Sequence, residues 1–158
     1  MKGSRPVAFI KIDKLAGARL NSRRKRLIIR LRVNTKSKVE FQDITSQVQE
    51  VVRTSGVEDG TCYIFVPHTT AAITVNEHDD PSVVLDISEQ LNRMVPQQGN
   101  YRHLEGNAPA HVKASLVGSS QVLLIEGGKL SLGTWQGLFF CEFDGPRQRA
   151  ILIKLVSD

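Results

Sequence analysis

The feature that most constrains the fold of this chain is a series of short apolar segments of strand length, bounded by glycine, proline and polar turn residues. Several of them alternate apolar with polar residues, which is the two-residue period of a half-buried β-strand. We expect the segment 61–66 to pair with 71–75, and the Asp144-Gly145 turn to join the last two strands as a hairpin. The predicted strands cover residues 7–12, 27–33, 61–66, 71–75, 121–125, 130–132, 135–143 and 150–156.

Apolar residues also recur at helical spacing in two places. One helix is predicted around Ile44 to Val52, a second begins at Pro81 and ends before Pro96, and Asn107 is placed to cap a short third helix. This mixture of elements predicts an α+β fold, with antiparallel-rich mixed β-sheets and two to three helices.

The composition fits one folded domain. The chain has 158 residues, of which 41% are hydrophobic and 23% charged, so it can bury a core of its own. No segment has the length of a membrane span, and the first residues lack the apolar core of a secretory signal. We therefore expect a cytoplasmic protein in a reducing compartment, in which Cys62 and Cys141 are buried thiols.

The positive charge of the chain is concentrated in one stretch. Such a cluster can attract phosphate or nucleic acid, but it also fits a solvated loop followed by the exposed face of a strand. We favour the second interpretation, because the segment has neither a recognition helix nor interleaved exposed aromatic residues. Nucleic acid is therefore not an expected partner. The formal net charge is +5, and the clustered residues are Arg19, Arg23, Arg24, Lys25, Arg26, Arg30 and Arg32.

Three of the four histidines fall in predicted connections, where ligands and catalytic groups are common. His68 follows a strand, His103 lies in the polar loop 97–106, and His111 lies near the start of the third helix. Neutral imidazole suits zinc and similar metals, so one hypothesis is a divalent ion held by these residues. The alternative is that they are ordinary loop or capping residues, and their spacing does not decide between the two.

Carboxylates cluster just after the strand 71–75. Glu77 stands near the strand end and is a candidate magnesium ligand, since magnesium binds one or two protein oxygens together with substrate phosphates. Asp79 and Asp80 are better explained as N-caps for the helix that begins at Pro81.

Two arginines near the C-terminus could form an anion site. Arg147 and Arg149 straddle Gln148, so in a strand they share a face on which guanidinium groups can bind phosphate oxygens. Lys113 and the free N–H groups at the start of the third helix would reinforce such a site. The alternative is a pair of solvated strand arginines.

Eight short motifs follow one another in a characteristic order: Asp43-Ile44-Thr45, His68-Thr69-Thr70-Ala71, Asn76-Glu77, Tyr101-Arg102-His103, Asn107-Ala108-Pro109-Ala110-His111, residues 128–130, Leu132-Gly133-Thr134-Trp135-Gln136 and Glu142-Phe143-Asp144-Gly145-Pro146-Arg147. Together they resemble the YjbQ-like family, whose members are also described as secondary thiamine-phosphate synthases. The resemblance covers the chain from about residue 26 to its end, and residues 128–142 are its most diagnostic part.

The resemblance implies an α+β subunit that assembles as a homotrimer, with a histidine-rich site near subunit contacts and thiamine-phosphate synthase activity in some members. We therefore expect one YjbQ-like domain over residues 1–158, in which 1–26 form a basic extension that is longer than the family pattern and 27–158 form the core. The loop between Tyr101 and Asn107 is shorter than the family pattern. The polar residues carried over are His68, Thr69, Asn76, Glu77, His103, Asn107, His111, Trp135, Gln136, Glu142, Asp144 and Arg147.

The function predicted first is a transferase that joins a hydroxymethylpyrimidine diphosphate to a thiazole phosphate with the help of a divalent ion, zinc or magnesium. The alternatives are a metal-dependent hydrolase of a small phosphate ester or amide, and a non-enzymatic trimeric binding protein. The expected partners are a small phosphorylated substrate and further copies of the chain, without a membrane. The predicted metal ligands are His68, His103 and His111, and the predicted catalytic residues are Asn76, Glu77, Lys113, Arg147 and Arg149.

Overall fold

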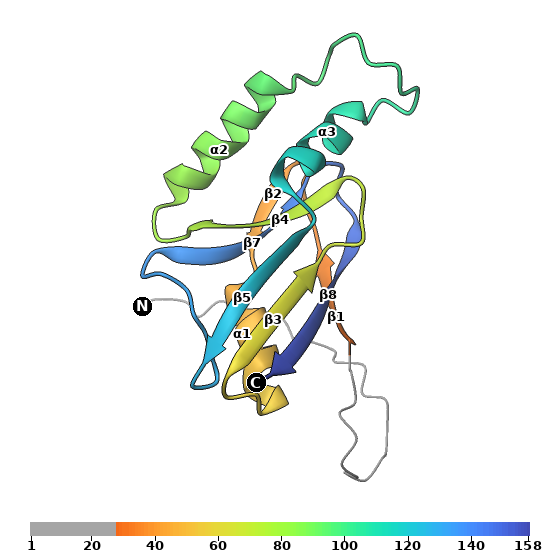
Figure 1. Cartoon of the computed structure of the whole chain (residues 1–158). Coiled ribbons are helices and arrows are strands. Elements are labelled where there is room, and N and C mark those ends of the chain that lie inside the picture. Colours follow the sequence, from red (N-terminus) through yellow and green to blue (C-terminus); the bar gives the residue numbers. More distant parts are fainter. Residues whose placement is uncertain (1–27) are drawn as a thin grey trace, which may run out of the picture.

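The computed structural model describes residues 28–158, which form two antiparallel β-sheets and three helices (Figure 1). The predicted strand 7–12 and the basic residues 19–26 lie outside the described part. The five-stranded sheet has the order β1 (Ile28–Asn34), β8 (Gln148–Ser157), β3 (Gly60–Phe65), β5 (Ser120–Glu126) and β6 (Lys129–Leu130). The three-stranded sheet has the order β2 (Glu40–Asp43), β7 (Gln136–Glu142) and β4 (Ala71–Glu77). Every strand pair is antiparallel, which confirms the predicted α+β class.

The main core lies between the two sheets and is closed by helix α1 (Thr45–Ser55). The inward residues of the five-stranded sheet, such as Leu31, Ile64 and Ile151, meet Ile73 and Phe140 from the three-stranded sheet. Helix α1 adds three valines to the same cluster and ends at Gly56, whose left-handed backbone (φ 72°) favours glycine. Burial of this apolar surface is the main favourable term in folding.

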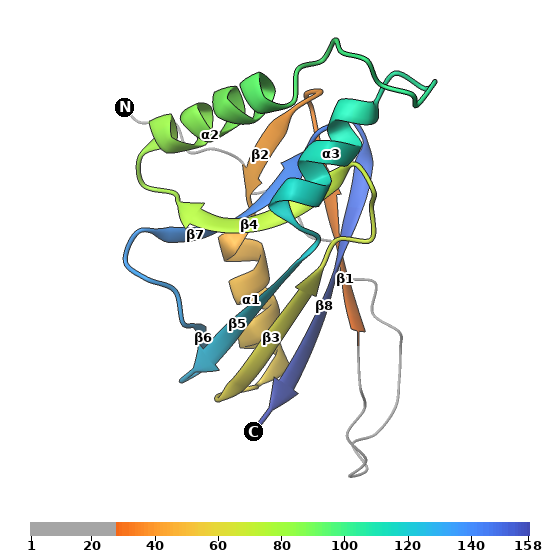
Figure 2. The same ribbon diagram turned by 45° about the horizontal axis from the view of Figure 1, so that its top comes forward.

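The other face of the three-stranded sheet is covered by α2 (Pro81–Met94) and α3 (Ala108–Val117), which lie together at one end of the molecule (Figure 2). A smaller apolar cluster holds this layer, with Phe139 and Cys141 on the sheet, Ala110 on α3, and Val84 and Leu91 on α2. The predicted start of α2 is confirmed, because Asp80 caps the helix by accepting a hydrogen bond from Ser82 N at 2.9 Å. Asn107 occupies the N-cap position of α3 as predicted, but its side chain makes no capping hydrogen bond.

Two strand pairings predicted from the sequence are wrong. The segment 71–75 does not pair with 61–66, since β3 belongs to the five-stranded sheet and β4 to the three-stranded one. The Asp144-Gly145 turn likewise connects β7 to β8 across the sheets and forms no hairpin. The reason is that β7 lies between β2 and β4, whereas β8 lies between β1 and β3. Both β7 and β8 are therefore hydrogen-bonded to other strands along both edges, so the turn between them cannot form a hairpin.

Strand β2 was not predicted, because three of its four residues are polar and they lack a clear alternation. The strands predicted at 27–33, 121–125 and 150–156 are confirmed with small changes in their ends. No helix in residues 28–158 has the length and apolar character that crossing a bilayer requires.

Candidate functional site

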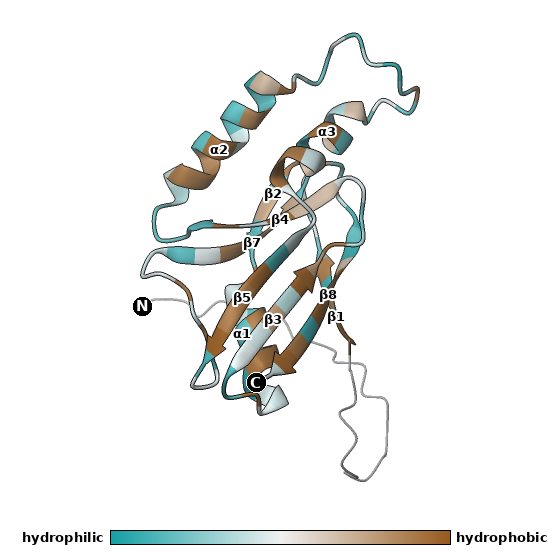
Figure 3. Ribbon diagram, in the orientation of Figure 1, coloured by the Kyte–Doolittle hydropathy of each residue, from teal (hydrophilic) through white to brown (hydrophobic). Residues whose placement is uncertain are grey.

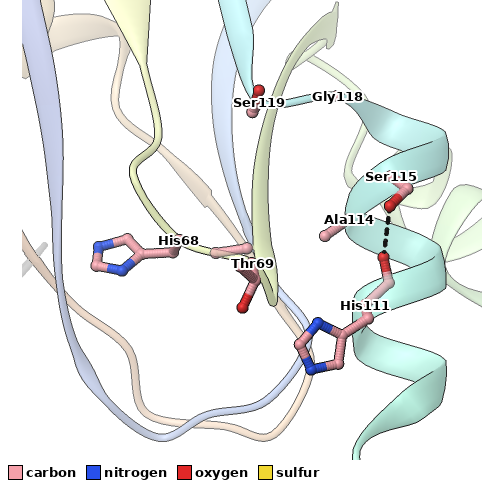
Figure 4. A pocket seen from close by; sticks show the side chains of 8 residues that line it. His68, Thr69, His111, Ala114, Ser115, Gly118 and Ser119 are labelled. Carbon is pink, nitrogen blue, oxygen red and sulfur yellow. Dashed lines mark hydrogen bonds between the residues drawn. The ribbon is translucent and has the colours of Figure 1, made fainter.

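A cavity of about 390 Å³ lies between the β3–β4 connection and helix α3 (Figure 4). The connection supplies His68 and Thr69, and the helix supplies His111 and Ser115, which are four residues apart and therefore share one helical face. Ser119 adds a further hydroxyl from the segment that leads into β5. The size falls at the lower end of the range for small-molecule sites, and the polar lining is concentrated in these five side chains.

The two histidines of this cavity do not face each other. In Figure 4 Thr69 and His111 both line the cavity, whereas the ring of His68 points away from His111, towards β8. There His68 Nε2 accepts a hydrogen bond from Ala150 N at 3.0 Å, so the proton of the neutral ring sits on Nδ1. Burial lowers the pKa of His68, and the nearby charge of Arg149 lowers it further. His68 therefore anchors the connection that presents Thr69.

His103 joins this arrangement through the third helix. The rings of His103 and His111 stand edge to face, with their centroids 5.2 Å apart. His103 also lines a second hollow of about 290 Å³ under the loop that precedes α3, together with Tyr101 and Pro109. The structure thus brings His103 next to His111 and places His111 and His68 around one cavity.

The described residues of one chain do not complete a metal centre. In residues 28–158 no three side chains of histidine, cysteine, aspartate or glutamate are grouped so that they could hold an ion. A metal-bound imidazole needs a free lone pair, and the Nε2 lone pair of His68 already accepts the Ala150 N–H. His103 and His111 lie next to each other, and His103 Nε2 is 3.6 Å from Glu105 Oε2, but the described residues do not complete a three-ligand group around them. The predicted metal site stays a prediction.

Arg149 is engaged in a buried ion pair rather than directed at the cavity. Its Nε and Nη2 donate to the two carboxylate oxygens of Glu142 at 2.7 and 2.6 Å, and Nη2 also donates to Thr70 Oγ1 at 2.8 Å. Glu142 is fully buried and accepts further hydrogen bonds from Thr35 Oγ1 and from the backbone N–H groups of Phe143 and Asp144. This network joins β1, β7, β8 and the connection that carries Thr69.

Arg147, two residues earlier, forms a different pair. Its Nη2 donates to Asp144 Oδ2 at 2.8 Å, and half of its side chain is exposed. Asp144 Oδ2 also accepts a hydrogen bond from Asn107 Nδ2 at the start of α3. A carboxylate therefore already lies beside this helix N-terminus, which does not favour the anion site predicted there.

Lys113 lies away from the cavity. It lies two positions after His111 on α3, a rotation of about 200°, and its Nζ donates to Asn92 Oδ1 of α2 at 2.5 Å. Only 3% of Lys113 is exposed, and no carboxylate of the described residues pairs with it. Burial, and then the charge of Lys38, lower its pKa.

Asn76 and Glu77 lie at the opposite end of β4 from the cavity. Ala71 lines the cavity and Glu77 ends the strand six residues later, a span of about 20 Å in an extended chain. Trp135 is exposed in the loop before β7, next to this far end of β4. Within one chain these residues do not join the histidines.

Ser115 and Ser119 were not predicted as site residues. A signal for Ser115 was present in the sequence, because it follows His111 by one helical turn; its hydroxyl donates to His111 O at 2.9 Å. Ser119 lies directly after the residue that caps α3, and only the fold places it in the cavity.

Comparison with known proteins assigns the chain to a family. The model of the family described as UPF0047 protein YjbQ-like matches residues 29–158. A UPF0047 protein of Methanocaldococcus jannaschii is 47% identical over 84% of this chain and 96% of its own length, and YugU of Bacillus subtilis is 45% identical over 80% and 97%.

Solved structures agree with this assignment. An uncharacterised family protein of Clostridium acetobutylicum, described as an ortholog of YugU, is 52% identical with a TM-score of 0.79, covering 81% of this chain and 99% of that one. A protein of unknown function from Sulfolobus solfataricus is 36% identical with a TM-score of 0.81, covering 85% and 99%. The sequence and the fold thus agree, and the chain belongs to the YjbQ-like UPF0047 family.

Proposed function

We propose that the chain is a secondary thiamine-phosphate synthase-like transferase that uses the cavity between the β3–β4 connection and α3. The observation that carries the proposal is that Thr69 and His111 line one cavity, which is large enough for a small phosphorylated heterocycle. The motif resemblance to secondary thiamine-phosphate synthases supports the choice of reaction.

The reaction joins two ligands in one substitution. The thiazole nitrogen attacks the methylene carbon of the pyrimidine diphosphate, a C–N bond forms, and the C–O bond to pyrophosphate breaks with its electron pair leaving on oxygen. Negative charge grows on the departing pyrophosphate, so hydrogen-bond donors at this point lower the barrier. Thr69 Oγ and the ring of His111 would supply these donors, and His103 would orient the His111 ring.

His68 and Arg149 have positioning roles in this proposal. His68 is held against Ala150, and Arg149 binds both Glu142 and Thr70, the residue after Thr69. Both contacts fix the short connection that carries Thr69. A hydrogen-bond donor held in place in this way lowers the barrier more than a flexible donor of the same kind. Arg147, Arg149 and Lys113 are therefore not assigned to substrate phosphates.

Self-association is part of the proposal. Helix α2 buries none of its residues, although Leu85 and Met94 are large apolar side chains and are more than half exposed. An amphipathic helix left this open is an expected contact for another protein surface. We expect a homotrimer with three times the 17.5 kDa mass of one chain, measured by light scattering.

The test is an assay of thiamine phosphate formation by the pure protein, with zinc, with magnesium and after chelation. We expect His111→Ala and Thr69→Ala each to lower turnover about 100-fold or more, in keeping with the loss of one positioned donor. His78→Ala is the matched control, because His78 is bound to Asp43 away from the cavity and should keep full activity.

Three results would contradict the proposal. Absence of product under every ion condition would contradict the proposed reaction. Full activity in His111→Ala would contradict the proposed site. Release of phosphate or amine from single substrates, without joined product, would assign hydrolysis instead. The dependence on zinc or magnesium decides whether a divalent ion takes part.

A further inference from the structure

The outer face of the five-stranded sheet is an uncovered surface. Helix α1 packs against the inner side, and α2 and α3 lie over the three-stranded sheet, so none of these three helices covers the outer face (Figures 1 and 2). Figure 3 shows that β3, β5 and β8 are rich in apolar residues, with polar residues at intervals along β3 and β8. The face is independent of the proposed transferase cavity.

Two aromatic side chains stand on the central strand of this sheet. Tyr63 and Phe65 are two residues apart on β3, so they point to the same face at a spacing of about 7 Å. They are 46% and 45% exposed, which is high for aromatic residues in the middle of a five-stranded sheet. Val122 lies directly opposite Tyr63 on β5 and is exposed as well.

Basic side chains flank the aromatic pair on one side. Lys154 on β8 lies opposite Tyr63, about 5 Å away. Phe65 lies opposite Leu152 on β8, and Leu152 in turn lies opposite Arg30 on β1, so Arg30 is two strands and about 10 Å from Phe65. Neither Lys154 nor Arg30 forms an ion pair with a carboxylate of the described residues. On the outward positions of β1, β8, β3 and β5 the one acidic residue is Glu126, at the far end of β5.

We infer that this face binds single-stranded nucleic acid. Exposed aromatic rings on an open antiparallel sheet can stack with bases, and flanking cations can bind the phosphate backbone. The sequence prediction weighed against nucleic acid because the basic segment contains no exposed aromatic residue. The structure supplies Tyr63 and Phe65 from β3, outside the basic segment.

The charge pattern favours this occupant over a second copy of the same face. A contact between two copies of this face would join two basic surfaces whose described residues offer no carboxylate to Arg30 or Lys154 at their centre, whereas a trimer joins two different surfaces of the chain. A polyanion neutralises these two cations instead and releases counterions. Self-association was assigned above to the exposed residues of α2, which lie on another side of the molecule.

The test is fluorescence anisotropy of labelled twelve-nucleotide oligo(dT) and oligo(rU) titrated with the full chain at several salt concentrations. Tyr63→Ala and Phe65→Ala should each weaken binding by about fivefold to a hundredfold, the loss expected for one stacked base. Tyr63→Phe keeps the ring and should bind like the native chain. Lys154→Gln should lower the slope of log affinity against log salt by about 0.7.

Controls separate the face from other basic or apolar surfaces. Leu116→Ala removes an equally exposed apolar side chain from α3 and should leave binding unchanged. Joint neutralisation of Arg23, Arg24, Lys25 and Arg26 tests the basic segment outside the described residues.

The inference is overturned if neither oligonucleotide binds at about 50 mM salt, where phosphate contacts are strong. It is also overturned if both alanine variants bind like the native chain, including the case in which only the neutralised basic segment loses binding. A fall in molecular mass of Tyr63→Ala or Phe65→Ala, with unchanged oligonucleotide affinity, would identify a second copy as the occupant.

Discussion

Arg147 and Arg149 lie two residues apart and each binds a carboxylate, yet their surroundings differ. The Arg149 side chain is 9% exposed and its partner Glu142 is fully buried, whereas half of the Arg147 side chain is in solvent. Arg149 faces the core between the sheets, and Arg147 lies at the surface, where the chain passes from β7 to β8. Arg149 is therefore part of a buried hydrogen-bond network, whereas Arg147 is a surface residue.

The difference explains why a shared sequence pattern does not give a shared role. The two arginines were predicted to form one phosphate-binding pair, because alternate strand residues share a face. A buried guanidinium needs its charge and its N–H groups satisfied by the protein, which Glu142 and Thr70 do here. Water can solvate the exposed guanidinium of Arg147, so it does not need these partners. The predictions below test this contrast.

Loss of Arg149 should have the largest effect. Arg149→Ala leaves the buried carboxylate of Glu142 without its cation, so the free energy of unfolding at neutral pH should fall by about 3–5 kcal/mol. Urea denaturation followed by circular dichroism measures it. The double variant Arg149→Met with Glu142→Leu should recover much of this loss, because it removes both charges together. A fall below about 1 kcal/mol in Arg149→Ala would show that the pair is not buried in solution.

Acid should weaken the same pair. Burial alone would raise the pKa of Glu142, but hydrogen bonds from Arg149 and Asp144 N–H hold it below its ordinary value. The ionised form therefore stabilises the fold above the ordinary pKa of 4.5, and this contribution is lost as the pH falls through the lower folded-state pKa. Stability curves between pH 7 and pH 3 should be flatter for Glu142→Gln than for the native chain. Parallel curves would contradict the assignment.

Thr70 should contribute less. Thr70→Val removes one hydrogen-bond acceptor from Arg149 Nη2, which still donates to Glu142 Oε1. The expected loss is about 1 kcal/mol in the free energy of unfolding. Thr70→Ser keeps the hydroxyl and serves as the matched control. An unchanged free energy of unfolding in Thr70→Val would show that this hydrogen bond contributes nothing to stability.

Arg147→Ala should have the smallest effect. Exposed ion pairs contribute less than about 1 kcal/mol, and water replaces the lost hydrogen bonds of Asp144. The measurement is the same urea titration that is used for Arg149→Ala. A loss in the free energy of unfolding as large as that of Arg149→Ala would contradict the proposed difference between the two arginines.

Sequence reasoning predicted the helices, the fold class and most strand positions, because periodicity, capping residues and turn signals are local. It did not predict which strands share a sheet, since that depends on how β7 and β8 bury both of their edges. It found His68, His103 and His111, but not that Glu77 lies at the end of β4 opposite the cavity, about 20 Å along the strand from Ala71. Nor could it give Arg149 its partner, because Glu142 lies on another sheet.

The central claim is that the cavity beside Thr69 and His111 receives a phosphorylated ligand. The most direct measurement is an NMR titration of the ring protons of all four histidines with a thiazole phosphate. The signals of His111, His103 and His68 should move with one saturating curve, while His78, bound to Asp43 elsewhere, stays unchanged. Unchanged signals for His111, or an equal shift for His78, would contradict the claim.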